Sequence, residues 1–232
     1  MYTYLSRAAV IFALPVAMIL SACSKPASSN NNNNNNNNGG SHSDLVASFT
    51  NVNSTTGVSS TFSFTYDGQN RQTGESFSDG TSPISYSYGS GTITKTQGTT
   101  TTVYTLNNAG MATSDNQGNT FSYDGNGFMT SETNTSGAST TNSISGGNIV
   151  STVQTTSTGA STTYTFSFTG KANTLKFGLN FLGSINANLI QTEGINGVNY
   201  AFTYTFDSYG RVLTLKIVSG PTTLSRTYTY IN

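Results

Sequence analysis

The chain has 232 residues with formally balanced charge, and charged side chains make up only 8% of it. This composition excludes the basic patch expected of a nucleic-acid-binding protein. It also provides no strong electrostatic attraction to an anionic membrane surface. Low charge together with abundant Ser, Thr, Asn and Gly favours an exposed β-protein of the cell envelope over a cytosolic enzyme. The 13 Tyr and 13 Phe residues can still supply a core.

Residues 1–22 have the pattern of a bacterial export signal. Residues 8–20 are apolar but too few to span a bilayer, which needs about 20 residues. The sequence "LSAC" follows and resembles a lipoprotein signal-peptidase box. This resemblance implies cleavage after Ala22, diacylglycerol on the Cys23 thiol and an acylated new amino group, which together form a stable membrane anchor. The alternative is an ordinary cysteine after an ordinary signal peptide.

The residues after Cys23 bear on localisation. Ser24 follows, and no Asp is present there to indicate inner-membrane retention, so we expect a lipid-anchored outer-membrane protein whose membrane partner is bound through its N-terminal lipid. The segment "SKPASS" leaves open whether the protein faces the periplasm or the cell surface. A disulfide within the chain is impossible, because the sequence contains one Cys.

Residues 23–44 are expected to form a disordered tether. This segment contains an uninterrupted run of asparagines from Asn30 to Asn38, then two glycines, and it has nothing to bury in a core. A coil of about 20 residues spans roughly 25 Å, which would hold a domain away from the membrane. Aggregation through the asparagine run is the alternative use of such a segment.

From Leu45 onward the sequence alternates with period two. Aromatic residues repeat at every second position and Ser or Thr lies between them, which is typical of strands with one buried and one wet face. We therefore predict one all-β domain over residues 45–232, an antiparallel meander of about 10 to 14 strands in a strongly bent sheet or partly closed barrel. The aromatics expected inside are Phe62, Phe64, Tyr66, Tyr86, Tyr88, Phe121, Tyr123, Tyr164, Phe166, Phe168, Tyr200, Phe202, Tyr204, Phe206, Tyr228 and Tyr230.

A loose repeat punctuates these strands: "YDGQNRQT", "LNNAGMAT", "YDGNGFMT" and "FDSYGRVL". In each copy an Asp or Asn follows an aromatic residue or Leu, and a Gly or Asn comes three residues later. The acidic or amide side chain can bond nearby backbone N–H groups, and Gly or Asn accepts positive φ. We interpret these residues as hairpin corners, not as a catalytic or metal site. The structural turn residues are Asp67, Asp124, Gly125, Gly127, Asp207 and Gly210.

These turn units resemble the YD repeats of bacterial wall-associated and Rhs-type proteins. The copy "FDSYGRVL" is the nearest match, through its Gly-Arg-Val end. The layout of lipobox, polar spacer and β-meander with YD-like turns is similar to a group of Bacteroidota-type envelope lipoproteins, over residues 45–232. The resemblance implies the fold. No reaction is established for that group.

One apolar segment, residues 174–190, departs from the strand pattern. Its leucines come close to helical spacing, but Gly178 and Gly183 oppose one long regular helix. We expect an irregular segment with a short helical turn that covers an open end of the sheet. A mobile apolar lid over a ligand site is the alternative.

Several enzyme chemistries are excluded. His42, the only histidine, lies in the tether, so the folded domain has neither a Ser-His-Asp nor a Cys-His system, nor a His/Cys zinc site. No phosphate-binding loop is present, and neither "SDNQGN" nor "YDGNG" matches a calcium loop. We therefore predict no metal and no cofactor. The remaining acids are expected on the solvated surface: Glu75, Asp79, Asp115, Glu132 and Glu193.

The prediction is a non-catalytic, membrane-anchored envelope lipoprotein, a binding or structural module whose ligand would be a glycan, a lipid or an envelope protein. A scaffold that pairs through an exposed sheet edge is a structural variant of this class. The alternative is a carboxylate-dependent hydrolase acting on glycans, which needs two acids across a sugar bond. The absence of Trp, the most effective residue for stacking on sugars, disfavours it.

Overall fold

A computed structural model describes residues 43–231. The predicted signal peptide, the cleavage site between Ala22 and Cys23, the lipidation of Cys23 and the tether up to residue 42 lie outside this range. Residues 43 and 44, assigned above to the tether, are held against the domain. Lys176 Nζ donates to Asp44 Oδ2 at 2.7 Å, and Arg211 Nη1 donates to the Ser43 carbonyl at 2.7 Å.

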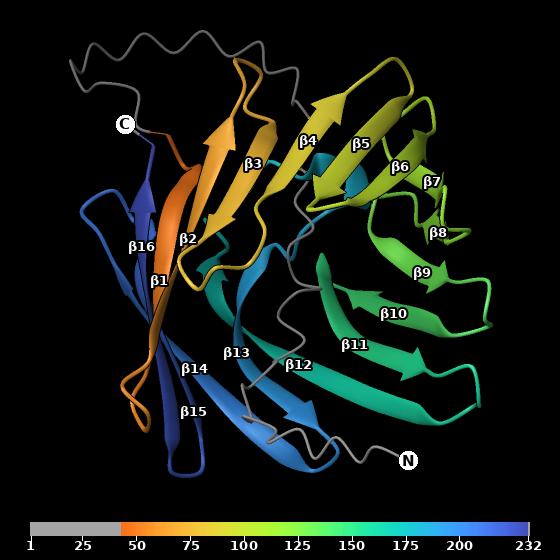
Figure 1. Cartoon of the computed structure of the whole chain (residues 1–232). Helices are drawn as coiled ribbons and strands as arrows, with labels where there is room; N and C mark the ends of the chain where they lie inside the picture. The colour runs from red at the N-terminus through yellow and green to blue at the C-terminus, as the bar shows by residue number, and fades with distance from the viewer. Residues whose placement is uncertain (1–42, 232) are drawn as a thin grey trace, which may run out of the picture.

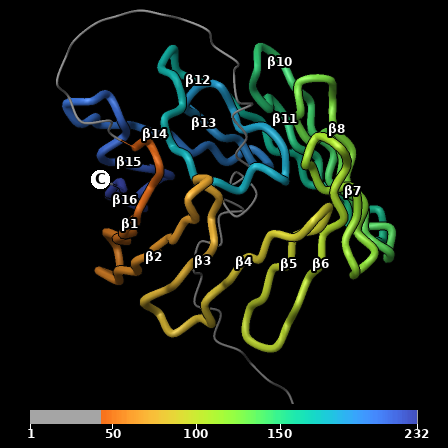
Figure 2. Tube along the Cα trace, turned by 90° about the horizontal axis from the view of Figure 1, so that it is seen from above, coloured from red at the N-terminus to blue at the C-terminus, as the bar shows by residue number. Residues whose placement is uncertain are grey.

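Sixteen antiparallel strands form one closed barrel (Figure 1). Each strand pairs with its neighbours in the sequence, and β1 pairs with β16 to close the ring, which Figure 2 shows from above. The all-β meander predicted from the sequence is thus confirmed, and its closure is complete. The strands are β1 (Val46–Asn53), β2 (Ser59–Tyr66), β3 (Gln72–Phe77), β4 (Ile84–Tyr88), β5 (Thr92–Gln97), β6 (Thr100–Leu106), β7 (Ala112–Asp115), β8 (Thr120–Tyr123), β9 (Met129–Thr133), β10 (Ser139–Ser145), β11 (Asn148–Thr155), β12 (Ser161–Ala172), β13 (Asn188–Ile195), β14 (Val198–Phe206), β15 (Val212–Ser219) and β16 (Thr222–Tyr230).

The barrel has more strands than the 10 to 14 predicted, and that count is wrong for a physical reason. The estimate assumed about 12 residues for a strand with its turn. Here β7 and β8 have only 4 residues each, and β10 is joined to β11 through Gly146 and Gly147 alone. Positive φ at both glycines allows this two-residue turn.

The period-two alternation places rings inside the barrel and hydroxyl groups outside. In β12, exposed Thr163 and Thr165 alternate with half-buried Tyr164 and Phe166. Outer hydroxyls bond across neighbouring strands: Thr50 with Thr61 at 2.9 Å, Ser167 with Thr192 at 2.6 Å, and Thr205 with Thr214 at 2.6 Å. Cross-strand pairs of this kind stabilise a sheet on its wet face.

Phe206 departs from the expected interior position and is 36% exposed. The strand register shifts between Thr205 and Phe206, so the pleat that keeps the other rings of β14 inside is interrupted at the last residue of the strand. The Lys171 ammonium lies 5.6 Å from the centre of the Phe206 ring.

A five-residue turn recurs around the barrel. In the copy at residues 124–128, Asp124 Oδ1 accepts from the Asn126 and Phe128 backbone N–H groups, each at 2.9 Å. Gly127 follows with φ +82°. This is a type I turn closed by a left-handed residue and a bulge. Two backbone bonds close this turn, from the first residue's N–H to the fifth residue's C=O and from the fourth residue's N–H to the first residue's C=O, and the same pair of bonds begins at Asp67, Asn107, Asp115, Asn134, Thr156 and Asp207.

Tyrosines fasten one end of the barrel. Each lies at or near the end of an even-numbered strand and donates its phenol hydrogen to a carbonyl of the preceding strand. The four bonds run from Tyr66 to Val46 at 2.6 Å, from Tyr88 to Gln72 at 2.6 Å, from Tyr204 to Ile190 at 2.8 Å and from Tyr230 to Val212 at 2.7 Å. Each bond ties two strands together where the backbone ladder ends.

Residues 173–187, hereafter the inner segment, cross this fastened end between β12 and β13. Their backbone bonds the strand ends and turns there: Val46 N–H to Lys176 C=O at 3.0 Å, Ser184 N–H to Gly127 C=O at 2.8 Å, and Ala187 N–H to Gly147 C=O at 2.9 Å. The segment contains a short 3-10 helix, η2 (Asn180–Leu182). The irregular apolar segment predicted near residues 174–190 therefore covers one end of the barrel, although Leu189 and Ile190 belong to β13.

The inner segment also contributes side chains to two clusters of core residues. Phe177 joins the first, with rings 5.2 Å from Phe64 and 6.4 Å from Phe49. Phe181 joins the second, 4.9 Å from the Tyr104 ring. No helix within residues 43–231 is long and apolar enough to cross a membrane.

Replacing Gly127 by Ala should lower the free energy of unfolding by about 1–3 kcal/mol, because a side chain is strained at positive φ. Its Cβ would also lie 3.1 Å from Ser184 Oγ in the inner segment. Gly125→Ala is the control, since its Cβ would meet nothing within 4 Å and its φ is not positive; we expect a change below about 0.5 kcal/mol. Asp124→Asn should be equally mild, because Asn accepts the same backbone bonds. Chemical denaturation measures all three, and equal losses at both glycines would contradict this account.

Candidate functional site: an acidic cavity in the barrel lumen

A cavity of about 480 Å³ lies inside the barrel. Leu179, Leu182 and Ile185 of the inner segment line one end of it. At the other end it reaches Gln117 and Asn119, in the connection between β7 and β8. The cavity therefore has an apolar floor made by the inner segment and a polar rim near that connection.

Its side walls come from strands β3 to β13 and are rich in aromatic rings. Five rings face the cavity because inward positions along these strands carry the aromatic residues of the period-two pattern. They are Tyr86, Tyr104, Phe121, Tyr164 and Phe166. Small polar side chains complete the wall: Thr102, Thr140, Asn142 and Thr152. Such a mixture of rings and a few polar groups is typical of a small-molecule site.

Four carboxyl groups also line the cavity: Glu75, Asp115, Glu132 and Glu193. Their predicted place on the solvated surface is wrong; only Asp79, in the connection after β3, is exposed. The alternation of residues along each strand could have predicted their inward position, but the polar residues around these acids made them look like loop residues. Glu75 shares its face with Phe77, and Glu193 shares its face with Ile195, so both had to point inward.

Glu193 is the most deeply placed of these acids and is only 2% exposed. Its cross-strand neighbours are Phe166 on β12 and Tyr200 on β14. Its Oε2 atom is buried and accepts no hydrogen bond from residues 43–231. Burial raises the pKa of Glu193 to about 7, because the charged form has lost its hydration.

The other three acids have charged or hydrogen-bonding neighbours. Burial raises the pKa of Glu75, and the Lys95 ammonium and the Gln72 side chain oppose that rise. Burial and the nearby Asp115 charge raise the pKa of Glu132. Asp115 itself is bound to its own turn, accepting from Gln117 N at 2.9 Å, Asn119 N at 3.0 Å and Asn119 Nδ2 at 2.8 Å.

The acids lie on separate strands around the wall. Across residues 43–231, no three Asp, Glu, His or Cys side chains come close enough together to hold a metal ion. The arrangement can instead present a dispersed negative field, with one unpaired carboxyl at Glu193, to a ligand surrounded by rings.

The turn residues identified from the sequence lie elsewhere. Asp67, Asp124 and Asp207 do not line the cavity. Asp67 Oδ2 accepts from Arg71 Nη2 at 2.6 Å, and the hydrogen bond from Arg71 lowers the pKa of Asp67. The Oδ1 atoms of Asp67, Asp124 and Asp207 each accept from backbone N–H groups of their own turns.

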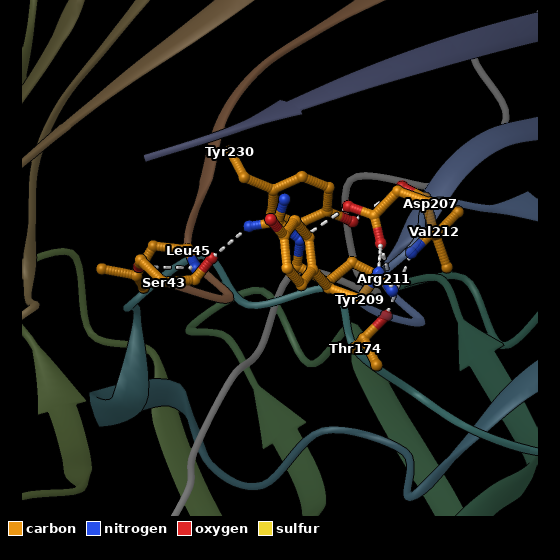
Figure 3. A network of polar contacts seen from close by, with 8 residues as sticks. All are labelled: Ser43, Leu45, Thr174, Asp207, Tyr209, Arg211, Val212 and Tyr230. Atoms are coloured by element: carbon orange, nitrogen blue, oxygen red, sulfur yellow. Dashed lines mark hydrogen bonds and ion pairs between the residues drawn. The ribbon is translucent and has the colours of Figure 1, made fainter. Parts of the chain in front are cut away.

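The turn at Asp207 also contacts residue Ser43, at the start of the described chain (Figure 3). Arg211 Nε donates to Asp207 Oδ2 at 2.8 Å, and the guanidinium lies 4.3 Å from the Tyr230 ring centre. The same cation holds the Ser43 carbonyl, so the turn fixes the point at which the chain enters the domain.

Comparison with known proteins identifies the fold. No protein-family model and no curated protein matches the chain. The structure is similar to the crystal structure of a porin-like protein from Bacteroides uniformis ATCC 8492, with TM-score 0.66 and 17% identity over 80% of this chain and 98% of that one. It is also similar to a porin-like protein from Bacteroides vulgatus ATCC 8482, with TM-score 0.56 and 13% identity over 81% and 98%. At these identities the likeness concerns the barrel fold alone.

The stability of the barrel should fall as pH rises. The native Glu193 carboxyl keeps its proton up to about pH 7, whereas the unfolded one loses it near 4.5. Its contribution to stability is therefore full below pH 4.5 and lost as pH rises through 7, a difference of about 3 kcal/mol. Glu193→Gln should remove that part of the fall. Urea titrations between pH 4.5 and 8.5 measure it.

Asp79→Asn is the control for this profile. The Thr81 side chain lowers the pKa of exposed Asp79, so its carboxyl is ionised in both native and unfolded states above pH 5. The slope of stability with pH should then match the wild type from pH 5 to 8. A Glu193→Gln variant that retains the full wild-type slope would show that this carboxyl is ionised in the native protein at neutral pH.

Proposed function

We propose that the protein is a non-catalytic binding protein of the cell envelope, held to the outer membrane by a lipid on Cys23, and that its barrel lumen takes up a small amphipathic ligand. The observation that carries the proposal is the 480 Å³ cavity lined by rings and closed at one end by the inner segment. The likeness to porin-like barrels supports an envelope location.

The outer face of the barrel favours binding over transmembrane conduction. A barrel that spans a membrane carries an apolar band on its outside, flanked by aromatic girdles. This barrel has the opposite arrangement, with rings inside and hydroxyls outside, as in the exposed residues of β12 and β16. Burying such a wall of hydroxyls in hydrocarbon would cost free energy at each unpaired group. The wall fits water, with the membrane reached only through the N-terminal lipid.

The hydrolase alternative gains one supporting feature, because Asp115 and Glu132 lie near each other on the cavity wall. A glycosidase needs one acid free to attack or to activate water. Both Asp115 oxygens are instead engaged by its own turn. Glu193 has no neighbouring carboxylate that influences its pKa. The arrangement therefore supports binding better than hydrolysis.

The lumen should bind a neutral apolar dye, and filling the cavity should abolish that binding. Thr140 lines the cavity, whereas its neighbour Thr141 is exposed on the outer face. Thr140→Tyr should weaken binding of N-phenylnaphthylamine by about tenfold or more, since the added ring occupies the ligand's space. Thr141→Tyr adds the same ring outside and should leave binding unchanged. Fluorescence titration measures both, and equal affinities in the two variants would place dye binding outside the lumen.

Removing the lipid should release the barrel into water. In a detergent phase separation, the wild-type protein should enter the detergent phase, whereas a Cys23→Ser protein produced without residues 1–22 should enter the aqueous phase, because a hydroxyl-covered barrel has no apolar band to solvate. Ser24→Ala is the control and should partition like the wild type. A Cys23→Ser protein that still enters the detergent phase would contradict both the lipid anchor and the wet outer face.

A further inference from the structure

Glu193 is an unusual wall residue for a cavity. Its side chain is 2% exposed, it faces the lumen, and its Oε2 atom has no hydrogen-bond donor anywhere in residues 43–231. An ionised carboxyl in such a place is costly unless a donor or a positive charge accompanies it. Residues 43–231 supply no hydrogen-bond donor to Glu193 Oε2, so a bound ligand could supply one.

The surroundings of Glu193 suit a cation. Phe166 and Tyr200 flank it on the neighbouring strands, and the faces of aromatic rings attract positive charge. Four carboxyl groups line the cavity against one ammonium, Lys95. Lys95 influences the pKa of Glu75 and not that of Glu193, so it does not serve as the partner of Glu193.

Building on the proposed function, we propose that the lumen selects an organic cation, a small molecule whose ammonium group pairs with Glu193 while its apolar body lies along the aromatic wall. A bare metal ion fits less well, because the acids are distributed over β3, β7, β9 and β13 and no three converge in residues 43–231. The apolar body of such a ligand would contact the rings of Tyr86, Tyr104 and Phe121. It would also contact the cavity floor at Leu179 and Leu182.

Binding is coupled to pH through this carboxyl. With a pKa of about 7, Glu193 binds the ammonium well only when ionised, so the affinity should rise about tenfold between pH 6 and pH 8. The groups that face it from adjacent strands are Tyr164 on β12 and Tyr200 on β14. Burial raises the pKa of Tyr164, which keeps that phenol neutral over this range. The other titratable groups of the cavity are Glu75, Tyr86, Lys95, Tyr104, Asp115 and Glu132.

The test uses three probes with the same alkyl chain: n-octylammonium, n-octanol and n-octanoate. Each is titrated at pH 8 into the full-length protein carrying N-phenylnaphthylamine, and displacement of the dye is measured. We expect n-octylammonium to bind about tenfold more tightly than n-octanol, and n-octanoate to bind most weakly, because a charge-assisted bond to a buried carboxylate adds at least that factor.

Variants assign the effect to Glu193. Glu193→Gln should erase the preference for n-octylammonium over n-octanol, together with the dependence of that preference on pH. Asp79→Asn removes the same charge from an exposed connection and should keep the preference. A far-ultraviolet circular dichroism spectrum equal to that of the wild type shows that the Glu193→Gln barrel is folded.

The outcomes separate two failures. If all three probes bind equally, or n-octanoate binds best, the cation proposal is overturned while lumen binding stands. If neither the dye nor any probe binds, the proposed function itself fails. A preference for n-octylammonium that survives Glu193→Gln would move the cation site to another acid and overturn the assignment to Glu193.

Discussion

A closed sheet of sixteen strands encloses more space than one inward layer of side chains can fill, and the rest of this structure depends on how that space is occupied. Barrels of this strand number can hold a water-filled channel. Here two devices reduce the lumen. Rings project inward from strands such as β2, β4, β12 and β16, and the inner segment inserts Phe177, Leu179 and Phe181 among them. What remains is a cavity of about 480 Å³, of a size for a small molecule.

The same constraint sets the chemistry of the two faces. Inside, each ring buries apolar area that stabilises the barrel, and tyrosines add a bond from ring to backbone at the end where the ladders stop. Outside, Ser and Thr leave a surface that water solvates and that hydroxyl pairs such as Thr50 and Thr61 reinforce. The barrel fold is similar to that of porin-like proteins, and here the rings lie inside and the hydroxyls outside.

Filling the lumen with rings also creates the site. Burial among the rings raises the pKa values of Glu75, Glu132 and Glu193, and Glu193 is left with an oxygen that has no donor in residues 43–231. Because burial raises its pKa to about 7, this carboxyl favours folding less at neutral pH than at pH 4.5.

The sequence by itself determined the elements and their faces, because period-two alternation and Asp/Asn–Gly turns are local properties of the chain. It predicted the meander, the ring-lined interior and the turn positions at Asp67, Asp124 and Asp207. It missed the strand count, since a strand as short as β7 has too few residues to show a clear period-two pattern, and it placed Glu193 on the surface. Only the tertiary structure brought Glu75 on β3 and Glu193 on β13 to one cavity, because their meeting depends on closure between β1 and β16 and on the insertion of residues 173–187. Those contacts join residues far apart in the chain, and no local pattern encodes them.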